Sequence, residues 1–469
     1  MLTWFNIQLN IMLERKVFKV LDRRKKEKNH LPIIIKGLRQ VGKTTSVIEF
    51  AKQNYENVFF LDFRSFIELR MVFSGNFDID EILLKLSPYK ARLSIIKGSD
   101  FIPYKTVLIF DEIQDCPDAR SSLKYFALDK RFDVISTGSY LGIDGYRDSK
   151  LASRGIGVGY EYQIEMKPLD FEEFLWSLNI DKKIIEKLKN CVDKSKQIDS
   201  YYHNLFLNLI KKYICVGGMP KAVTTFLDTN DLDKVREVQV NLIKSFKSDF
   251  GMHLSQSGEI RVDESEKRKI LDVFDSIPKQ LAKENNKFQY SLVNKGGSQR
   301  TYQDSLKWLK EYGLIDVCCN VSTLEEPLSF FAIDNQFKVY FSDIGLLMAS
   351  LPKEIAFKVI NDDLGLGKGA IFENLIAETL NKNGKKLFYF AKSSGLEIDF
   401  IEPFLDGLYL IEVKARSGNA KSSKTVLANP NYKVKGLIKF TAQNIGQVDN
   451  KKTIPYYLAF YVTSKEFIS

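Results

Sequence analysis

The sequence predicts an α/β protein built on a parallel sheet, and three observations support this prediction. The β-branched run Ile33, Ile34 and Ile35 leads into a glycine-containing turn. A second apolar run, residues 107–110, ends in two acids, and further strand-like segments at 57–63 and 132–136 are separated by helical ones. Buried parallel strands are continuous apolar runs, and strands that alternate with helices are typical of a sheet covered on both faces.

The turn after the first strand has the spacing G-x-x-x-x-G-K-[ST], formed by Gly37, Gly42, Lys43 and Thr44. In this pattern backbone N–H groups converge on a triphosphate, the lysine reaches the β- and γ-phosphates, and the hydroxyl ligates Mg²⁺. Residues 45–53 are expected to form a helix whose N-terminus faces the phosphates. A chance glycine loop is the alternative. We expect ATP and Mg²⁺ to bind here, and the residues predicted to contact the nucleotide are Gly37, Arg39, Gln40, Val41, Gly42, Lys43, Thr44 and Thr45.

Two further strand ends carry polar residues that suit the same site. Asp111 and Glu112 follow the strand at 107–110. In phosphate-loop ATPases the first acid holds the Mg²⁺ water shell, and the second orients and deprotonates the attacking water. The strand at 132–136 ends in Thr137-Gly138-Ser139, where a hydroxyl such as Ser139 could sense the γ-phosphate. A simple turn is the alternative there.

Length and composition limit the other possibilities. The 469 residues suggest about three domains, with 44% hydrophobic and 27% charged residues, as in a globular protein. No apolar run approaches the ~18 residues of a spanning helix, and we expect a cytoplasmic protein with no membrane partner. The five cysteines form no C-x-x-C pair, so a zinc site or a disulfide framework is not expected. The net charge of +10 permits a polyanionic partner such as DNA.

The middle of the chain is predicted to be largely helical. Residues 13–28 form a basic amphipathic helix, and residues 167–178 and 205–249 form helices broken at Gly217–Pro220, which suit a lid behind the nucleotide. Ser298 could cap a helix that ends at Gly313, and a strand at 314–321 would follow, as in a winged helix-turn-helix. Its outward side chains could enter a major groove or pack between domains. These side chains are Arg300, Gln303, Lys307 and Lys310.

The C-terminal part contains a candidate metal site. Strand-like segments at 395–401 and 408–415 carry Asp399 on one and Glu412 with Lys414 on the other. This order resembles the metal-ion signature of restriction-endonuclease-like nucleases. Asp399 and Glu412 would ligate Mg²⁺, Lys414 would stabilise developing charge, and Glu373, on a preceding helix, would add a further acid. The alternative is a salt-bridged sheet edge without a metal.

The segments GLRQVGKTT, LIFDEIQD, STGSYLG, LASRG, KPLDFEEFL and YICVGGMPKAV occur in this order. Together they resemble the bacterial and archaeal AAA-type ATPases that carry the domain of unknown function numbered 4143. The resemblance implies an AAA-type core, a winged helix and a nuclease-like C-terminal domain. It also makes Arg154 a candidate arginine finger, with a surface ion-pair arginine as the alternative. The expected domains are an ATPase core, a helical lid, a winged helix-turn-helix and a restriction-endonuclease-like α/β domain, at residues 1–165, 166–260, 261–350 and 351–469.

These observations predict a Mg²⁺-dependent ATPase with a nuclease-like C-terminal domain that binds and could cleave DNA. Two other hypotheses remain open: a non-cleaving, ATP-dependent DNA-binding switch and an ATP-dependent protein-interaction module. A homo-oligomer is possible in each case.

Overall fold

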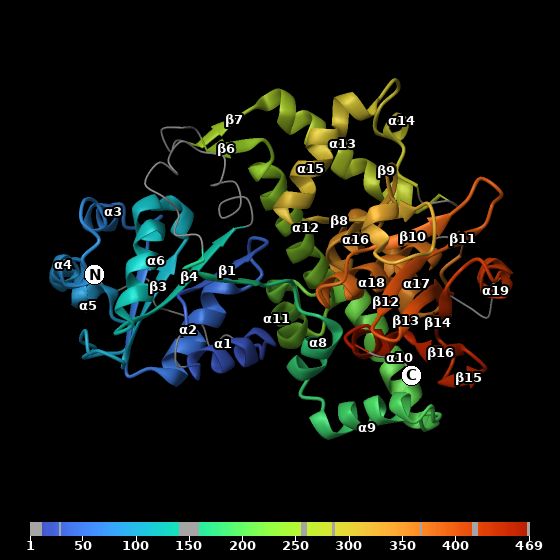
Figure 1. The fold of residues 1–469 in the computed structure, drawn as a ribbon, viewed down its shortest axis with the longest axis horizontal. Coiled ribbons are helices and arrows are strands. Elements are labelled where there is room, and N and C mark those ends of the chain that lie inside the picture. Colours follow the sequence, from blue (N-terminus) through green and yellow to red (C-terminus); the bar gives the residue numbers. More distant parts are fainter. Residues whose placement is uncertain are drawn as a thin grey trace.

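The computed structural model describes residues 12–27, 30–139, 159–254, 260–283, 287–365, 368–414 and 421–466. An N-terminal α/β lobe lies at one end of the molecule and a second α/β lobe at the other, with long helices between them (Figure 1).

The N-terminal lobe contains a five-stranded sheet in the order β2-β3-β4-β1-β5. All four of its strand pairings are parallel, which confirms the predicted parallel sheet. The short, polar strand β5 was not predicted from the sequence. The strands are β1 (Ile33–Gly37), β2 (Asn57–Asp62), β3 (Thr106–Asp111), β4 (Asp133–Ser139) and β5 (Tyr162–Glu165).

Helices cover both faces of this sheet. Ile33 and Ile35 belong to one apolar cluster with α1 (Val17–Lys25) and α2 (Lys43–Asn54), whereas Ile34 belongs to a second cluster on the other face. The alternation explains why the whole β-branched run is apolar. The elements that contribute to the second cluster are α3 (Glu68–Val72), α4 (Ile79–Leu86), α5 (Lys90–Leu93), η2 (Ile113–Asp115) and α6 (Pro117–Asp129).

The central helices meet at the Gly-Gly-Met-Pro segment. Gly218 N donates to Asp343 Oδ2 at 2.6 Å, and Leu169 N donates to Gly218 O at 2.7 Å. A Cβ on Gly218 would lie 2.0 Å from Leu169 O, so close backbone packing requires glycine here. The helices are α8 (Phe171–Ser177), α9 (Lys182–Asp193), α10 (Ser200–Val216), α11 (Pro220–Thr229) and α12 (Leu232–Asp249).

The following segment contains a short strand pair, three helices and a long strand pair. Tyr302, Leu306 and Leu309 of α15 are buried, and the four polar side chains predicted to face outward are exposed. Ser298 is the N-cap residue of α15, as predicted, although its hydroxyl bonds to the Thr301 hydroxyl and not to a backbone N–H. The elements are β6 (Met252–Leu254), β7 (Ile260–Val262), α13 (Glu264–Leu281), α14 (Tyr290–Val293), α15 (Gln299–Tyr312), β8 (Ile315–Val321) and β9 (Ala332–Phe341).

The C-terminal lobe contains a mixed sheet in the order β12-β13-β14-β16-β15, while β10 and β11 extend the sheet of β8 and β9. The strand expected at 395–401 is divided at Asp399. The elements are α16 (Ile344–Ser350), α17 (Glu354–Ile360), α18 (Lys368–Lys382), β10 (Phe388–Ala391), β11 (Glu397–Ile398), β12 (Phe400–Phe404), β13 (Gly407–Val413), α19 (Lys421–Ala428), β14 (Val434–Thr441), β15 (Gly446–Val448), β16 (Lys451–Pro455) and α20 (Ala459–Val462).

None of the helices in the described ranges combines the length and the apolar character needed to cross a membrane.

Candidate functional site

The loop between β1 and α2 depends on both motif glycines. Gly42 has φ +88°, a backbone conformation that other residues rarely adopt, and it turns the chain into α2. Gly37 is needed for a different reason, because a Cβ there would lie 2.2 Å from Met166 O, just beyond β5. The loop is therefore held against the carboxyl edge of the sheet, where ligands bind in such folds.

Lys43 lies beneath the loop and is only 6% exposed. Its Nζ donates to Gly37 O at 3.0 Å and to Leu38 O at 2.9 Å. Burial lowers the pKa of Lys43 to about 8, although Glu112 and Asp111 oppose this shift. A buried ammonium group that faces backbone carbonyls is stabilised when a negative ligand approaches, so this residue fits a bound triphosphate.

Asp111 ends β3 and receives hydrogen bonds from two hydroxyls. Thr44 Oγ1 donates to Asp111 Oδ1 at 2.7 Å, and the Thr137 hydroxyl donates to the same oxygen. Burial raises the pKa of Asp111, and these two hydrogen bonds oppose the shift. A hydroxyl and a carboxylate side by side provide the hard oxygen ligands that Mg²⁺ prefers, so the residues fit this ion. Thr137, which precedes the predicted Ser139 on β4, is the residue whose hydroxyl reaches Asp111.

Glu112 is held by an arginine that the sequence analysis missed. Arg64 Nη2 lies 3.0 Å from Glu112 Oε2, and Arg64 Nε donates to Asp115 Oδ2 at 2.8 Å. The Gln114 amide also donates to the Glu112 carboxylate. Arg64 lies just after β2, the strand beside β3. A cation at that position was the signal in the sequence from which this contact could have been predicted. In this structure Glu112 is thus engaged by protein groups.

Two loop residues point toward the central helices. Arg39 Nη1 lies 2.6 Å from Asp249 Oδ2 at the end of α12, and Gln40 Nε2 donates to Ser245 Oγ at 3.2 Å. Asp249 also accepts from the Tyr312 hydroxyl, at the end of α15. The loop is therefore connected by side chains to both α12 and α15, a link that sequence patterns did not indicate.

Arg15, which precedes α1, supports the loop from the other side. Its Nη1 donates to Val41 O at 2.9 Å and its Nη2 to Lys167 O at 2.6 Å. Its Nε donates to Glu173 Oε1 at 3.2 Å, and Arg15 is buried. The N-terminal segment is thus part of the loop's support. The predicted finger residue Arg154 lies outside the described residues.

The predicted C-terminal acids also come together. Phe400 pairs with Ile411 in an antiparallel register, which places Asp399 beside Glu412. Lys414 Nζ lies 2.5 Å from Glu412 Oε2 and 3.7 Å from Asp399 Oδ2. Val413 N donates to Asp399 Oδ2 at 2.7 Å, and Ser423 Oγ donates to Glu412 Oε1 at 2.5 Å. Burial raises the pKa of Asp399 to about 7, and Glu373 and Glu412 add to this rise.

Glu373 joins this cluster through residues of β9 that the sequence analysis missed. Lys338 Nζ lies 2.9 Å from Glu373 Oε1 and 2.8 Å from Glu397 Oε1, and the Tyr340 hydroxyl also donates to Glu373. The Lys338 side chain is 1% exposed. Within the described ranges, no three His, Cys, Asp or Glu side chains are arranged to hold a metal ion. As arranged, the carboxylates of Glu373 and Glu412 are ion-paired with Lys338 and Lys414.

Comparisons with known proteins agree with the N-terminal assignment. Residues 29–175 match an AAA domain family, residues 207–354 match the domain of unknown function DUF8612, and residues 368–458 match the domain of unknown function DUF4143. No curated protein sequence is significantly similar to the chain.

Some solved structures are similar to the chain at low sequence identity. A Walker-type ATPase of Pyrococcus abyssi is 15% identical, with a TM-score of 0.41, over 72% of this chain and 96% of that one. The ORC2 protein of Aeropyrum pernix, in ADPNP-ADP complexes, is 13% identical, with a TM-score of 0.36, over 74% of this chain and 91% of that one. Residues 29–175, which hold the loop and strand ends described above, are thus similar to an AAA domain, and residues 368–458 are similar to the domain of unknown function 4143.

Proposed function

We propose that the chain hydrolyses ATP with Mg²⁺ at the loop of residues 37–45, and that its nucleotide state is relayed to modules that engage DNA. The observation that carries the first part is the meeting of Lys43, Thr44, Asp111 and Glu112 at the carboxyl edge of one parallel sheet. The AAA domain match supports ATP binding and hydrolysis at this edge.

Each residue has a distinct role in this proposal. Mg²⁺, when bound, neutralises phosphate charge. Thr44 and Asp111 supply oxygen ligands, and Lys43 exchanges its carbonyl partners for phosphate oxygens. Glu112 accepts a proton from the attacking water, for which it must first leave Arg64. Arg154 is proposed to stabilise charge on the γ-phosphate, in the same subunit or in a neighbouring one.

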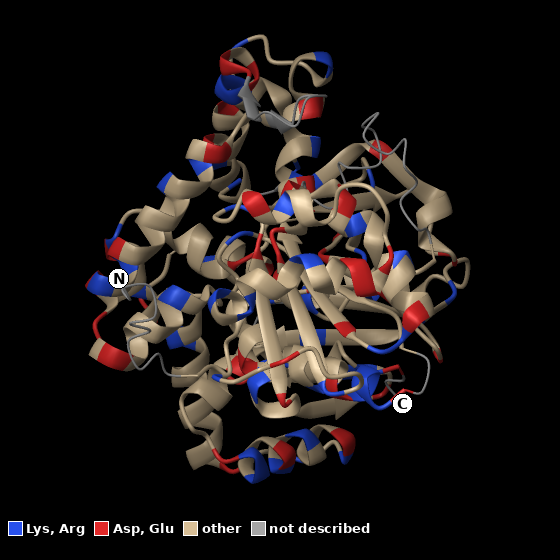
Figure 2. Ribbon diagram, turned by 90° about the vertical axis from the view of Figure 1, so that its left-hand side faces the viewer, with Lys and Arg blue, Asp and Glu red and all other residues tan. Residues whose placement is uncertain are grey.

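The DNA-binding part rests on the segment from α13 to β9. Three helices followed by an antiparallel strand pair are the element order of a winged helix-turn-helix, and Arg300 and Gln303 are exposed on α15. Lys and Arg are interspersed with Asp and Glu in the view of Figure 2. DNA contact is therefore proposed for α15 and not for a broad basic face.

A second candidate function is DNA cleavage by the C-terminal lobe. Its elements follow the order helix, strands, helix, strand from α18 to β14, and Asp399, Glu412 and Lys414 adjoin on neighbouring strands. Asp399 and Glu412 are the proposed Mg²⁺ ligands, and a metal would have to displace Lys414 from Glu412. A non-cleaving DNA switch and a protein-interaction module remain the competing proposals.

One set of assays separates these functions. ATP hydrolysis is measured with and without duplex DNA, and nicking of supercoiled plasmid is measured with Mg²⁺, in the parent and in Lys43→Ala, Glu412→Ala and Lys414→Ala. Loss of hydrolysis in Lys43→Ala is expected, and unchanged hydrolysis would contradict the proposal. Nicking that Glu412→Ala abolishes would support the nuclease. Salt-sensitive DNA binding without nicking would support the switch, and no DNA binding at low salt would leave the protein-interaction module.

A further inference from the structure

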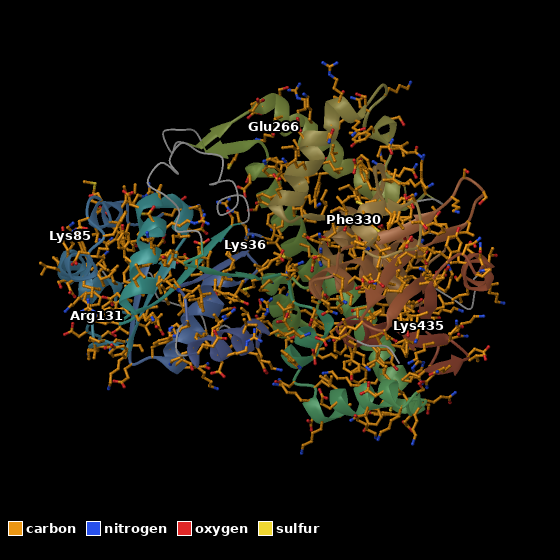
Figure 3. All side chains as sticks on the ribbon, in the orientation of Figure 1. Lys36, Lys85, Arg131, Glu266, Phe330 and Lys435 are labelled. Carbon is orange, nitrogen blue, oxygen red and sulfur yellow. The ribbon has the colours of Figure 1, made fainter. Side chains whose placement is uncertain are left out.

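A cavity of about 430 Å³ lies between the N-terminal sheet and the segment from α15 to β8. Pockets for small ligands are typically ~300–1,000 Å³, so this one can hold a ligand the size of a nucleotide. Figure 3 places Lys36 of β1 where the N-terminal lobe meets the central helices. The lining residues that bear on a ligand are Lys36, Lys167, Lys307, Lys310, Asp316 and Asn381.

The cavity is separate from the loop that holds Lys43, although the two share a wall. Leu38 lines the cavity, and its carbonyl accepts from Lys43 Nζ, whereas Lys43 itself is not part of the lining. Lys167 follows β5, and its backbone carbonyl accepts from Arg15. A ligand in the cavity would therefore contact the edge of the sheet beside the nucleotide loop and not the loop's own phosphate position.

Four lysines from two modules face this space, together with the acids Glu165, Glu311 and Asp316. The nearest acid contacts of two of these lysines are long: Lys167 Nζ lies 3.6 Å from Glu165, and Lys307 Nζ lies 3.7 Å from Glu311. Lys167 Nζ also donates to Asn381 O at 2.9 Å and to the Asn381 side-chain oxygen, so this lysine is engaged by the protein. Lys307 and Lys310 are exposed at the α15 wall. The ammonium groups of Lys307 and Lys310 retain donors for an anionic ligand such as a phosphate group.

The surroundings of Asp316 indicate which chemical groups, besides a phosphate, the ligand carries. Its Oδ2 is buried and has no hydrogen-bond partner among the described residues. Burial raises the pKa of Asp316 to about 6, although Lys167 opposes this shift. A buried carboxylate oxygen without a donor is costly, and a ligand with hydroxyl or N–H groups could supply that donor. The cavity thus combines cations for a phosphate with an acceptor for donor groups.

We propose that this cavity binds a nucleoside phosphate, with its phosphate among Lys36, Lys307 and Lys310 and its sugar or base donors toward Asp316. The same chemistry has two sources, a free mononucleotide or the phosphorylated end of a DNA strand. This inference does not depend on ATP hydrolysis at the loop of residues 37–45.

The test is equilibrium dialysis of labelled dAMP against the full chain with excess ADP and Mg²⁺, repeated in Lys43→Ala so that the nucleotide loop does not contribute. We expect saturable binding at one site per chain in both proteins. Lys310→Glu should weaken binding by roughly tenfold or more, because an attractive charge becomes a repulsive one. Lys358→Glu, at an exposed lysine of α17 outside the lining, should leave binding unchanged.

A second variant tests the contact with the nucleoside part of the ligand separately from the contact with its phosphate. Asp316→Leu should weaken dAMP binding while inorganic phosphate, measured by the same method, binds as in the parent. If dAMP does not bind but a 5′-phosphorylated oligonucleotide does, and Lys310→Glu weakens that binding, the site is assigned to a DNA end and the proposal is supported. No binding of either probe, or equal binding in Lys310→Glu and the parent, would overturn it.

Discussion

Glu112 is ion-paired with Arg64 at 3.0 Å, and this contact opposes its proposed role as a general base. Removing Arg64 should free the carboxylate to meet a water molecule. We therefore expect Arg64→Ala to raise basal ATP hydrolysis roughly threefold or more, since a partly buried ion pair contributes on the order of 1 kcal/mol. The measurement is steady-state phosphate release without DNA.

Lys85→Ala is the matched control for Arg64→Ala, because Lys85 also pairs with a glutamate, Glu81, but within α4, which contains none of the residues of the nucleotide site. Its hydrolysis rate should equal that of the parent. A rate in Arg64→Ala that falls well below the parent would instead show that Arg64 assists the reaction.

Asp316 gives a pH-dependent prediction. Its pKa is raised from 3.8 to about 6, chiefly by burial, so the charged carboxylate is disfavoured in the folded chain. The contribution of Asp316 to the free energy of unfolding is most favourable below about pH 4, and it is lost as the pH rises through 6. Asp316→Asn should therefore be more stable than the parent near pH 8, by on the order of 2 kcal/mol, and the two should converge near pH 4.

Urea unfolding at several pH values measures this difference. Asp363→Asn, at an exposed carboxylate, is the control and should follow the parent at each pH. If Asp316→Asn were less stable than the parent near pH 8, the carboxylate would have a stabilising partner, and the conclusion that its charge destabilises the folded chain would be wrong.

The phosphate-loop residues could be predicted from sequence because their spacing within one segment encodes the site. The residues that restrain them could not be. Arg64 follows β2 and Thr137 lies on β4, the two strands that flank β3, and Lys338 reaches Glu373 from β9. Such contacts depend on strand order and packing, which local patterns do not contain. The hydroxyl of Thr137 donates to Asp111, whereas the γ-phosphate contact of Ser139 stays a prediction.

At the scale of elements, the Gly-Gly-Met-Pro segment joins the central helices to α16. A Cβ at position 218 would lie 2.0 Å from Leu169 O and 2.8 Å from Leu169 N, both backbone atoms that cannot move aside cheaply. Gly218→Ala should destabilise the chain by roughly 3 kcal/mol or more, or prevent folding. Thermal unfolding of the purified protein measures this loss.

Gly369→Ala is the control for this substitution, because nothing lies within 4 Å of a Cβ there. It should unfold at or slightly above the parental temperature, since alanine favours helix α18. Equal melting temperatures for Gly218→Ala and the parent would mean that the segment is not packed as described.

Element boundaries show where sequence periodicity stops being informative. The apolar strands β1, β3 and β4 were predictable as continuous buried runs, whereas the short, polar β5 carries no such signal. The segment at 395–401 has the alternation of one strand, yet β11 pairs with β10 and β12 pairs with β13, so it divides at Asp399. The break is set by the change of pairing partner, which the alternation within the segment does not encode.

At the scale of the whole molecule, the nucleotide loop is connected to α12 and α15 through Arg39, Asp249 and Tyr312. If DNA contacts α15, this link offers a route by which DNA changes the loop. We expect Asp249→Ala to keep basal hydrolysis within about twofold of the parent but to lose most of its stimulation by DNA. Hydrolysis measured across a DNA titration tests this expectation.

Tyr312→Phe is the graded control, since it removes only the hydroxyl that donates to Asp249. Its stimulation should fall between those of the parent and Asp249→Ala. Full stimulation in Asp249→Ala would exclude this route. The domain limits after residues 165, 260 and 350 stay predictions, although the sheet that joins β8 and β9 to β10 and β11 crosses the last of them.

In the proposed reaction Lys43 holds the phosphates of ATP while Glu112 activates water for their hydrolysis. Its most direct measurement is the identity of the nucleotide that stays bound after incubation with ATP and Mg²⁺. Glu112→Gln should retain ATP with little conversion to ADP, the parent should yield ADP, and Lys43→Ala should retain neither. Conversion to ADP at the parental rate in Glu112→Gln, or parental nucleotide retention in Lys43→Ala, would contradict the claim.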